Sequence, residues 1–197
     1  MQSQRTSGAG DEKLLLATRD AVIMHGVRRT TANDIAERAG LSRMTFYRRM
    51  GSVENAVLAT LTREFRTAAT GVRVASPSGT GREQLVHFAI SSVRVFATSE
   101  LLASIAERDP EFLIPYITDR FGASQQLLLD ELDSLISAGL ADGSVEATGA
   151  TAATVLLALQ GVALSARLLG KTGGFESTVN ELEKMLTRHL TPQGTGA

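Results

Sequence analysis

Residues 31–56 contain two short helical patterns joined by a tight connection, and this stretch constrains the fold more than any other part of the chain. The connection is Ala39-Gly40-Leu41. The second pattern carries basic, hydroxyl and aromatic side chains in close succession, namely Arg43, Thr45, Tyr47, Arg48 and Arg49. A short helix with such groups, braced by a partner helix, fits the major groove of duplex DNA. We therefore expect this stretch to form a DNA-binding helix pair.

The spacing of these residues also predicts how the two helices begin and which faces they bury. Thr31-x-x-Asp34 is a capping-box pattern with Asp in place of Glu, and Ser42 is suited to cap the second helix. Phe46 and Met50 are four residues apart, so they share the face that packs inward. The opposite face is centred on Met44 and Arg48, which predicts that this side meets DNA.

The charge is unevenly distributed along the chain. Residues 1–66 hold eleven Lys and Arg against seven Asp and Glu, a net charge of +4, and the remainder brings the whole chain to −1. A basic N-terminal part on an acidic body is compatible with nucleic-acid binding. A chance fluctuation would explain the same values, so charge alone does not decide the function.

The composition argues against an enzyme. There is no cysteine, which excludes thiol catalysis, thiolate metal sites and disulfides. The three histidines (His25, His87 and His189) are far apart in sequence, and no His, Asp and Glu cluster has metal-ligand spacing. The charged run at 107–111 is interpreted as a solvated helix end before a proline turn. We expect no catalytic residue, no metal and no cofactor.

Helical periodicity extends over the rest of the chain, and no stretch has the alternation of a β-strand. The expected fold is all-α, with about nine helices: a three-helix DNA-binding domain followed by a larger helical domain. The expected divisions are a flexible arm at 1–10, a DNA-binding domain at 11–56, a helical domain at 57–190 and a flexible tail at 191–197. Within the larger domain we expect a loop at 70–82, helices at 83–98, 101–108, 147–169 and 175–190, and a long helix at 111–138 that Pro115 could bend.

The segment 147–169 is nearly free of charge and apolar around most of its circumference. A helix of this kind must be buried on most sides. In a chain of this length the expected cover is helix 175–190 together with a second subunit, so we expect a homodimer formed through these two helices.

The stretch from about residue 14 to 62 resembles the TetR family of transcriptional regulators. The matching residues are Thr31, Ile35-Ala36, Ala39-Gly40-Leu41-Ser42, Thr45-Phe46-Tyr47-Arg48 and Gly51-Ser52-x-Glu54. The resemblance implies that Thr31 contacts phosphate, that residues 43–49 enter the major groove, and that Arg43 and Arg48 are candidates for guanine. The full set of expected DNA contacts is Arg28, Thr31, Ser42, Arg43, Met44, Thr45, Tyr47, Arg48 and Arg49.

Two positions differ from the family pattern. Val53 stands where a lysine is common, and Met50 replaces the usual aromatic residue. The first change removes a phosphate contact, and the second softens the packing under the recognition helix. Arg28 and Arg29, which precede the first helix of the pair, could replace the lost positive charge.

Without a signal-peptide pattern or a membrane-spanning stretch, the sequence predicts a cytoplasmic protein. The resemblance further implies a homodimeric repressor that binds a palindromic operator and is released by a small-molecule effector. The sequence offers few charges for the interior, so the effector should be mainly apolar. Its expected contacts are Phe96, Tyr116, Phe121, Gln125, Leu128 and Gln160. The alternatives are a DNA-binding dimer without a ligand and, least favoured, an all-α enzyme. No apolar stretch reaches the length of a membrane span.

Overall fold

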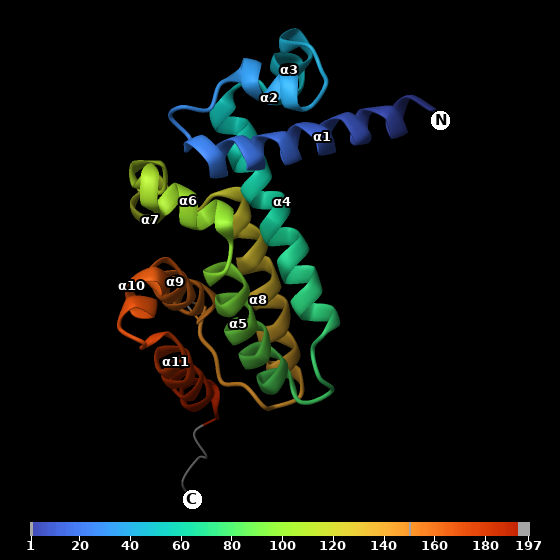
Figure 1. Cartoon of the computed structure of the whole chain (residues 1–197). Coiled ribbons are helices and arrows are strands. Elements are labelled where there is room, and N and C mark those ends of the chain that lie inside the picture. Colours follow the sequence, from blue (N-terminus) through green and yellow to red (C-terminus); the bar gives the residue numbers. More distant parts are fainter. Residues whose placement is uncertain (1, 150, 193–197) are drawn as a thin grey trace, which may run out of the picture. The chain divides into compact units, whose positions relative to one another are not determined.

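The computed structural model describes residues 2–149 and 151–192, with side chains from Ala9 onward, and this part of the chain is all-α (Figure 1). The α-helices are α1 Gln2–His25, α2 Ala32–Arg38, α3 Arg43–Met50, α4 Val53–Val74, α5 Gly81–Ala97, α6 Glu100–Arg108, α7 Pro115–Thr118, α8 Ala123–Ala141, α9 Thr151–Leu164, α10 Ala166–Lys171 and α11 Phe175–Leu190, with a 3-10 helix η1 at Pro110–Phe112. The expected fold class is confirmed. No single helix in the described residues combines the length and hydropathy needed to cross a membrane; α5 and α6 reach that threshold only as a pair joined across a break.

The predicted flexible arm at 1–10 is wrong, because α1 begins at Gln2. Residues 2–10 contain no proline, and extending an existing helix is much less costly than nucleating a new one. The helix that begins at Asp11 in the sequence pattern therefore continues towards the N-terminus. Of the predicted tail, residues 193–197 lie outside the described part of the chain.

Three predictions for the larger domain also need correction. The predicted loop at 70–82 is only 75–80, since α4 continues to Val74 and buries Val72. The predicted long helix at 111–138 is divided into η1, α7 and α8, because Pro110 and Pro115 can start a helical turn but cannot lie inside one. The predicted helix at 147–169 is divided into α9 and α10 at Ser165. The number of α-helices is therefore eleven in the described residues rather than about nine.

The chain divides into two compact units. The first unit consists of residues up to Glu64 together with Ser99–Ala123, and the second consists of Phe65–Thr98 together with Ser124 onward. The sequence predicted a single boundary near residue 56. The structure differs because α6, η1 and α7, which come after the second-unit segment Phe65–Thr98 in the sequence, belong to the first unit.

The core of the first unit lies where α1, α2, α3 and the start of α4 meet (Figure 1). Leu14, Ile35 and Phe46 are completely buried there. Several alanines fill the remaining positions and let the short helices approach closely, namely Ala17, Ala21, Ala32, Ala36, Ala39 and Ala56. Small side chains at these positions explain how helices of seven and eight residues pack firmly on α1.

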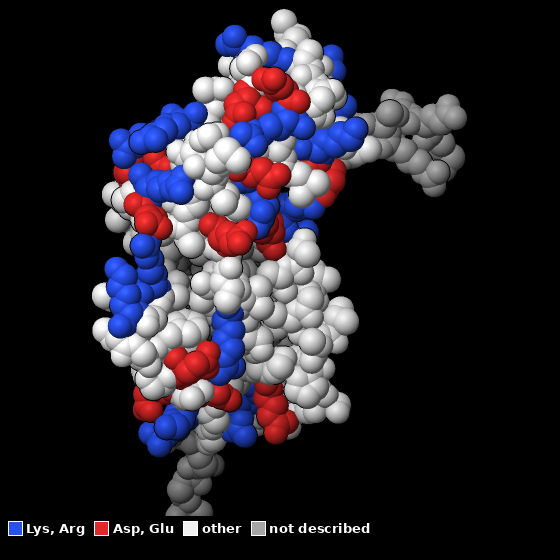
Figure 2. Space-filling model, in the orientation of Figure 1, with Lys and Arg blue, Asp and Glu red and all other residues white. Residues whose placement is uncertain are grey.

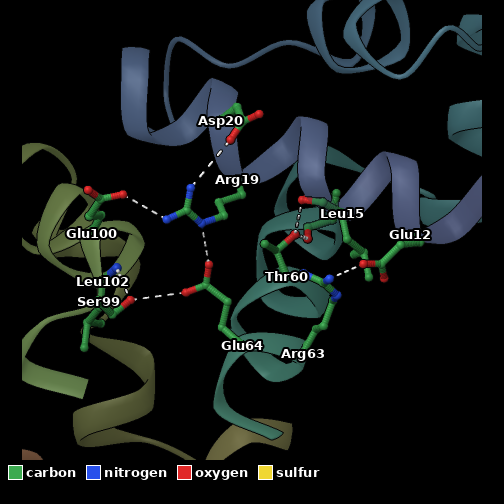
Figure 3. A network of polar contacts seen from close by, with 11 residues as sticks. Glu12, Leu15, Arg19, Asp20, Thr60, Arg63, Glu64, Ser99, Glu100 and Leu102 are labelled. Atoms are coloured by element: carbon green, nitrogen blue, oxygen red, sulfur yellow. Dashed lines mark hydrogen bonds and ion pairs between the residues drawn. The ribbon is translucent and has the colours of Figure 1, made fainter. Parts of the chain in front are cut away.

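A polar network joins α6 to the other helices of the first unit (Figure 3). The Arg19 guanidinium donates from Nε to Glu64 (2.8 Å) and from Nη2 to Glu100 (2.9 Å). Ser99 caps α6 and also donates to the second oxygen of Glu64. Burial lowers the pKa of Arg19, but hydrogen bonds from its guanidinium to Glu100 and Glu64 raise it by more. Arg19 therefore stays charged and links α1, α4 and α6.

The second unit is built around the apolar faces of α5, α8, α9 and α11. Leu85, Phe88, Leu132 and Leu190 are completely buried in this core. The start of α5 lies so close to α8 that a Cβ atom on Gly81 would come within 2.3 Å of the Gly139 backbone. Glycine is therefore required at this crossing.

Two carboxylates accept hydrogen bonds at the start of α5: Glu83 within the helix cap, and Asp142 from the turn that follows α8. They give the stability of this region a pH dependence. Hydrogen bonds from Thr80 lower the pKa of Glu83, and hydrogen bonds from Ser144 and from the Gly81 amide lower that of Asp142. A depressed folded-state pKa stabilises the fold above the unfolded-state value and loses that effect as the pH falls through the folded-state value. We expect the double variant Glu83→Gln/Asp142→Asn to unfold at lower urea concentration than the wild type at about pH 7.

The difference in urea midpoint should shrink as the pH falls below about 4, because the carboxylates are protonated first in the unfolded state and only at lower pH in the folded state. Urea titrations followed by circular dichroism at several pH values provide the measurement. A difference that is independent of pH would contradict this role.

Candidate nucleic-acid interface

The α2–turn–α3 segment forms for local reasons that its sequence makes visible. The Thr31 hydroxyl accepts a hydrogen bond from the Asp34 amide, and the Ser42 hydroxyl accepts one from the Thr45 amide, so both helices are capped. Gly40 in the connection and Gly51 after α3 have φ of +66° and +75°, which favours glycine. The predicted N-caps at Thr31 and Ser42 are confirmed. The reciprocal half of the predicted capping box is not formed, because the Asp34 carboxylate accepts from Arg38 instead.

Helix α3 is anchored by its inner face. Phe46 is completely buried, and Met50 and Val53 are partly buried against the same cluster. Tyr47 packs edge-on against the Phe46 ring, with centroids 5.4 Å apart. Val53 thus stabilises the α3–α4 junction at the position where the family pattern often has lysine.

The outer face of α3 presents basic and apolar side chains to solvent. Arg43, Met44, Tyr47 and Arg48 are all exposed, Met44 by 75% and Tyr47 by 42%. The Arg43 guanidinium lies over the Tyr47 ring, 5.5 Å from its centroid. At the position of α3, Figure 2 shows blue side chains on both sides of an uncharged surface. This face has the composition of a surface that enters the major groove.

Two other predicted DNA contacts are engaged within the protein. Arg49 forms an ion pair of 2.7 Å with Asp11 on α1, and its side chain is only 22% exposed. Thr45 is half-buried, and its hydroxyl lies 2.9 Å from that of Ser42. A DNA contact by Arg49 would compete with Asp11, so its first role is to hold α3 on α1.

Arg28 is also occupied, by acidic residues that follow α6. Its Nε donates to Asp109 (3.1 Å) and its Nη2 pairs with Glu111 (2.6 Å), although the side chain is 70% exposed. Arg28 therefore fixes the α1–α2 loop in this structure, and a phosphate contact would use the same cation. Arg29 is exposed beside it.

The interpretation of residues 107–111 as a solvated helix end is wrong for Asp109, which is 3% exposed. Its carboxylate accepts a hydrogen bond of 2.6 Å from the Val27 amide in the α1–α2 loop. Two further bonds reach α1 from α6: Ser104 donates to the Val22 carbonyl and Arg108 to the Met24 carbonyl. No local sequence pattern indicates this contact, since the residues are about 80 positions apart.

The six residues predicted to contact an effector fall in both units. Phe96, Gln125, Leu128 and Gln160 belong to the second unit, whereas Tyr116 and Phe121 belong to the first. Phe96 and Leu128 are buried in the apolar core. The Gln125 amide donates to the Gln160 side chain across 2.7 Å, so α8 and α9 share a polar pair among apolar neighbours.

The fold and the α2–α3 geometry define a helix-turn-helix protein. The model of the bacterial regulatory proteins of the tetR family matches residues 14–54. An uncharacterised HTH-type transcriptional regulator of Mycobacterium tuberculosis is 30% identical over 192 residues, covering 96% of this chain and 98% of the relative. The chain belongs to the TetR family of transcriptional regulators and has its helix-turn-helix DNA-binding segment.

Solved structures share this fold at low sequence identity. The R. erythropolis transcriptional repressor QsdR from the TetR family has a TM-score of 0.65 at 17% identity, covering 95% of this chain and 98% of that one. SmeT in complex with triclosan has a TM-score of 0.64 at 17% identity, covering 96% and 95%. The family is one of regulators and is not an enzyme class.

Proposed function

We propose that this protein is a ligand-responsive, cytoplasmic, homodimeric repressor that binds a palindromic operator through α3. The observation that carries the proposal is the outer face of α3, where exposed Arg43 and Arg48 stand on a helix that is capped by Ser42 and anchored by buried Phe46. Arginine donates bidentately to guanine O6 and N7, which gives sequence specificity.

The second unit supports dimer formation. Apolar side chains along α9, α10 and α11 are left uncovered by this chain: Leu157 is 50% exposed, Leu168 66% and Met185 60%. Gly161 is exposed one helical turn after Leu157 on α9 and would let a second helix approach closely. A second subunit on this face would bury the apolar surface and place two recognition helices on one operator, about 34 Å apart or somewhat more.

An effector would act through the second unit. The Gln125–Gln160 pair gives the mainly apolar second unit two amide groups that could exchange their mutual hydrogen bond for one to a ligand. SmeT, solved with triclosan, shows that a protein of this fold can hold a small molecule. A mainly apolar effector with one or two polar groups would favour a conformation with unsuitable helix spacing and so release DNA.

Selection of bound duplexes from a random DNA pool tests the proposal. We expect one enriched palindrome. Its two-fold symmetry also tests the dimer, because a two-fold dimer binds two identical half-sites. Arg48→Ala should weaken binding to it by about tenfold or more and relax the preference at one position of each half-site. Arg66→Ala removes the same charge from an exposed position on α4 and is the matched control. Failure to enrich any sequence would contradict the proposal.

A further inference from the structure

The internal contacts of the first unit decide which side chains of α3 remain for DNA bases. Arg49 is held by Asp11, Phe46 is buried, and Thr45 contacts Ser42 in the helix cap. Arg43 lies over the Tyr47 ring at one edge of the outer face. Among the described residues Arg48 has no hydrogen-bond or ion-pair partner, and Met44 is 75% exposed.

Met44 and Arg48 are one helical turn apart at the centre of the outer face, opposite buried Phe46. Single exposed apolar side chains are common on proteins, so exposure alone identifies no contact. The second observation is the position: this methionine lies between two arginines on the face that the helix-turn-helix geometry turns towards the groove. Water would solvate a charged or hydroxyl side chain at this position better than methionine, and methionine offers a base only a weakly accepting sulfur.

We infer that Met44 contacts the 5-methyl group of a thymine in the major groove, one or two base-pair steps from the guanine that Arg48 contacts. The thymine methyl is the one apolar group that bases present in that groove. Four residues of helix advance by about 6 Å, and successive base pairs by about 3.4 Å, which sets the separation. The flexible thioether chain can adjust to the methyl group. This inference rests on the proposed function.

The test removes the thymine methyl group from the DNA and, in a separate variant, the Met44 side chain from the protein. In the enriched operator, each thymine in turn is replaced by deoxyuridine in both half-sites, and the affinities of the wild-type full chain and of Met44→Ala are measured. For the wild type we expect one position at which deoxyuridine weakens binding by about fourfold per half-site. For Met44→Ala the same replacement should have no effect.

Met44→Leu keeps an apolar group and should retain most of the deoxyuridine effect. Leu140→Ala, an exposed aliphatic position on α8, should leave the wild-type pattern unchanged. The inference would be wrong, with the proposed function intact, if no thymine of the enriched operator were sensitive to deoxyuridine. It would also be wrong if Met44→Ala showed the same sensitivity as the wild type. No enriched operator at all would overturn the proposed function, and the inference with it.

Discussion

Phe46→Ala is expected to destabilise the first unit by about 3–5 kcal/mol and to abolish operator binding at ambient temperature. Phe46 is completely buried between α1, α2 and α3, and its ring supports that of Tyr47. The substitution removes the aromatic ring and leaves a cavity that the surrounding alanines are too small to fill. Because small domains are stable by only about 5–15 kcal/mol, this loss is a large fraction of the total.

Urea unfolding followed by circular dichroism, together with operator titrations, measures both effects of this change. Met44→Ala, two positions away on the same helix, is the control for stability only, since an exposed side chain contributes little to the free energy of unfolding. Equal unfolding midpoints for Phe46→Ala and Met44→Ala would contradict the assignment of Phe46 as the anchor of α3.

Asp109→Ala is expected to destabilise the first unit by about 2–4 kcal/mol. The buried carboxylate accepts from the Val27 amide and from Arg28 Nε, and its removal leaves a backbone N–H without its partner. Since these groups lie in the loop that leads into α2, the variant should also bind the operator more weakly. The expected cost is larger than for a surface ion pair because Asp109 is almost fully shielded from water.

Glu111→Ala provides the matched control for Asp109. Glu111 pairs with the same arginine, Arg28, but its side chain is 49% exposed. Its removal should cost about 0.5 kcal/mol. Unfolding free energies from urea titrations of both variants give the comparison. If the two variants lose the same stability, burial of Asp109 is not what holds the α1–α2 loop.

Local sequence patterns predicted the DNA-binding helices well. The hydroxyls of Thr31 and Ser42, the glycine at 40 and the spacing of Phe46 and Met50 act within one or two turns of chain, so their structural consequences are visible in the sequence. The outward orientation of Met44 and Arg48 follows from the same spacing.

Long-range partners could not be predicted in this way. The sequence predicted Arg28 and Arg49 as DNA contacts, and it did not indicate that the folded chain pairs them with acids 81 and 38 positions away. The charged run at 107–111 has the composition of an exposed helix end, and only the folded chain shows that Asp109 is covered. The prediction for Pro115 was also wrong: this residue begins the short helix α7 and does not bend a long helix.

The sequence by itself determined the class of fold, the position of the recognition helix and the face that it exposes. It could do so because helix caps, glycine turns and apolar periodicity are local properties of the chain. Only the tertiary structure decided which arginines of the first unit stay available to DNA, that α6 belongs with the DNA-binding helices, and that Gln125 meets Gln160. Each of these depends on segments that are distant in sequence and are brought together when their apolar faces are buried, and no local pattern records that pairing.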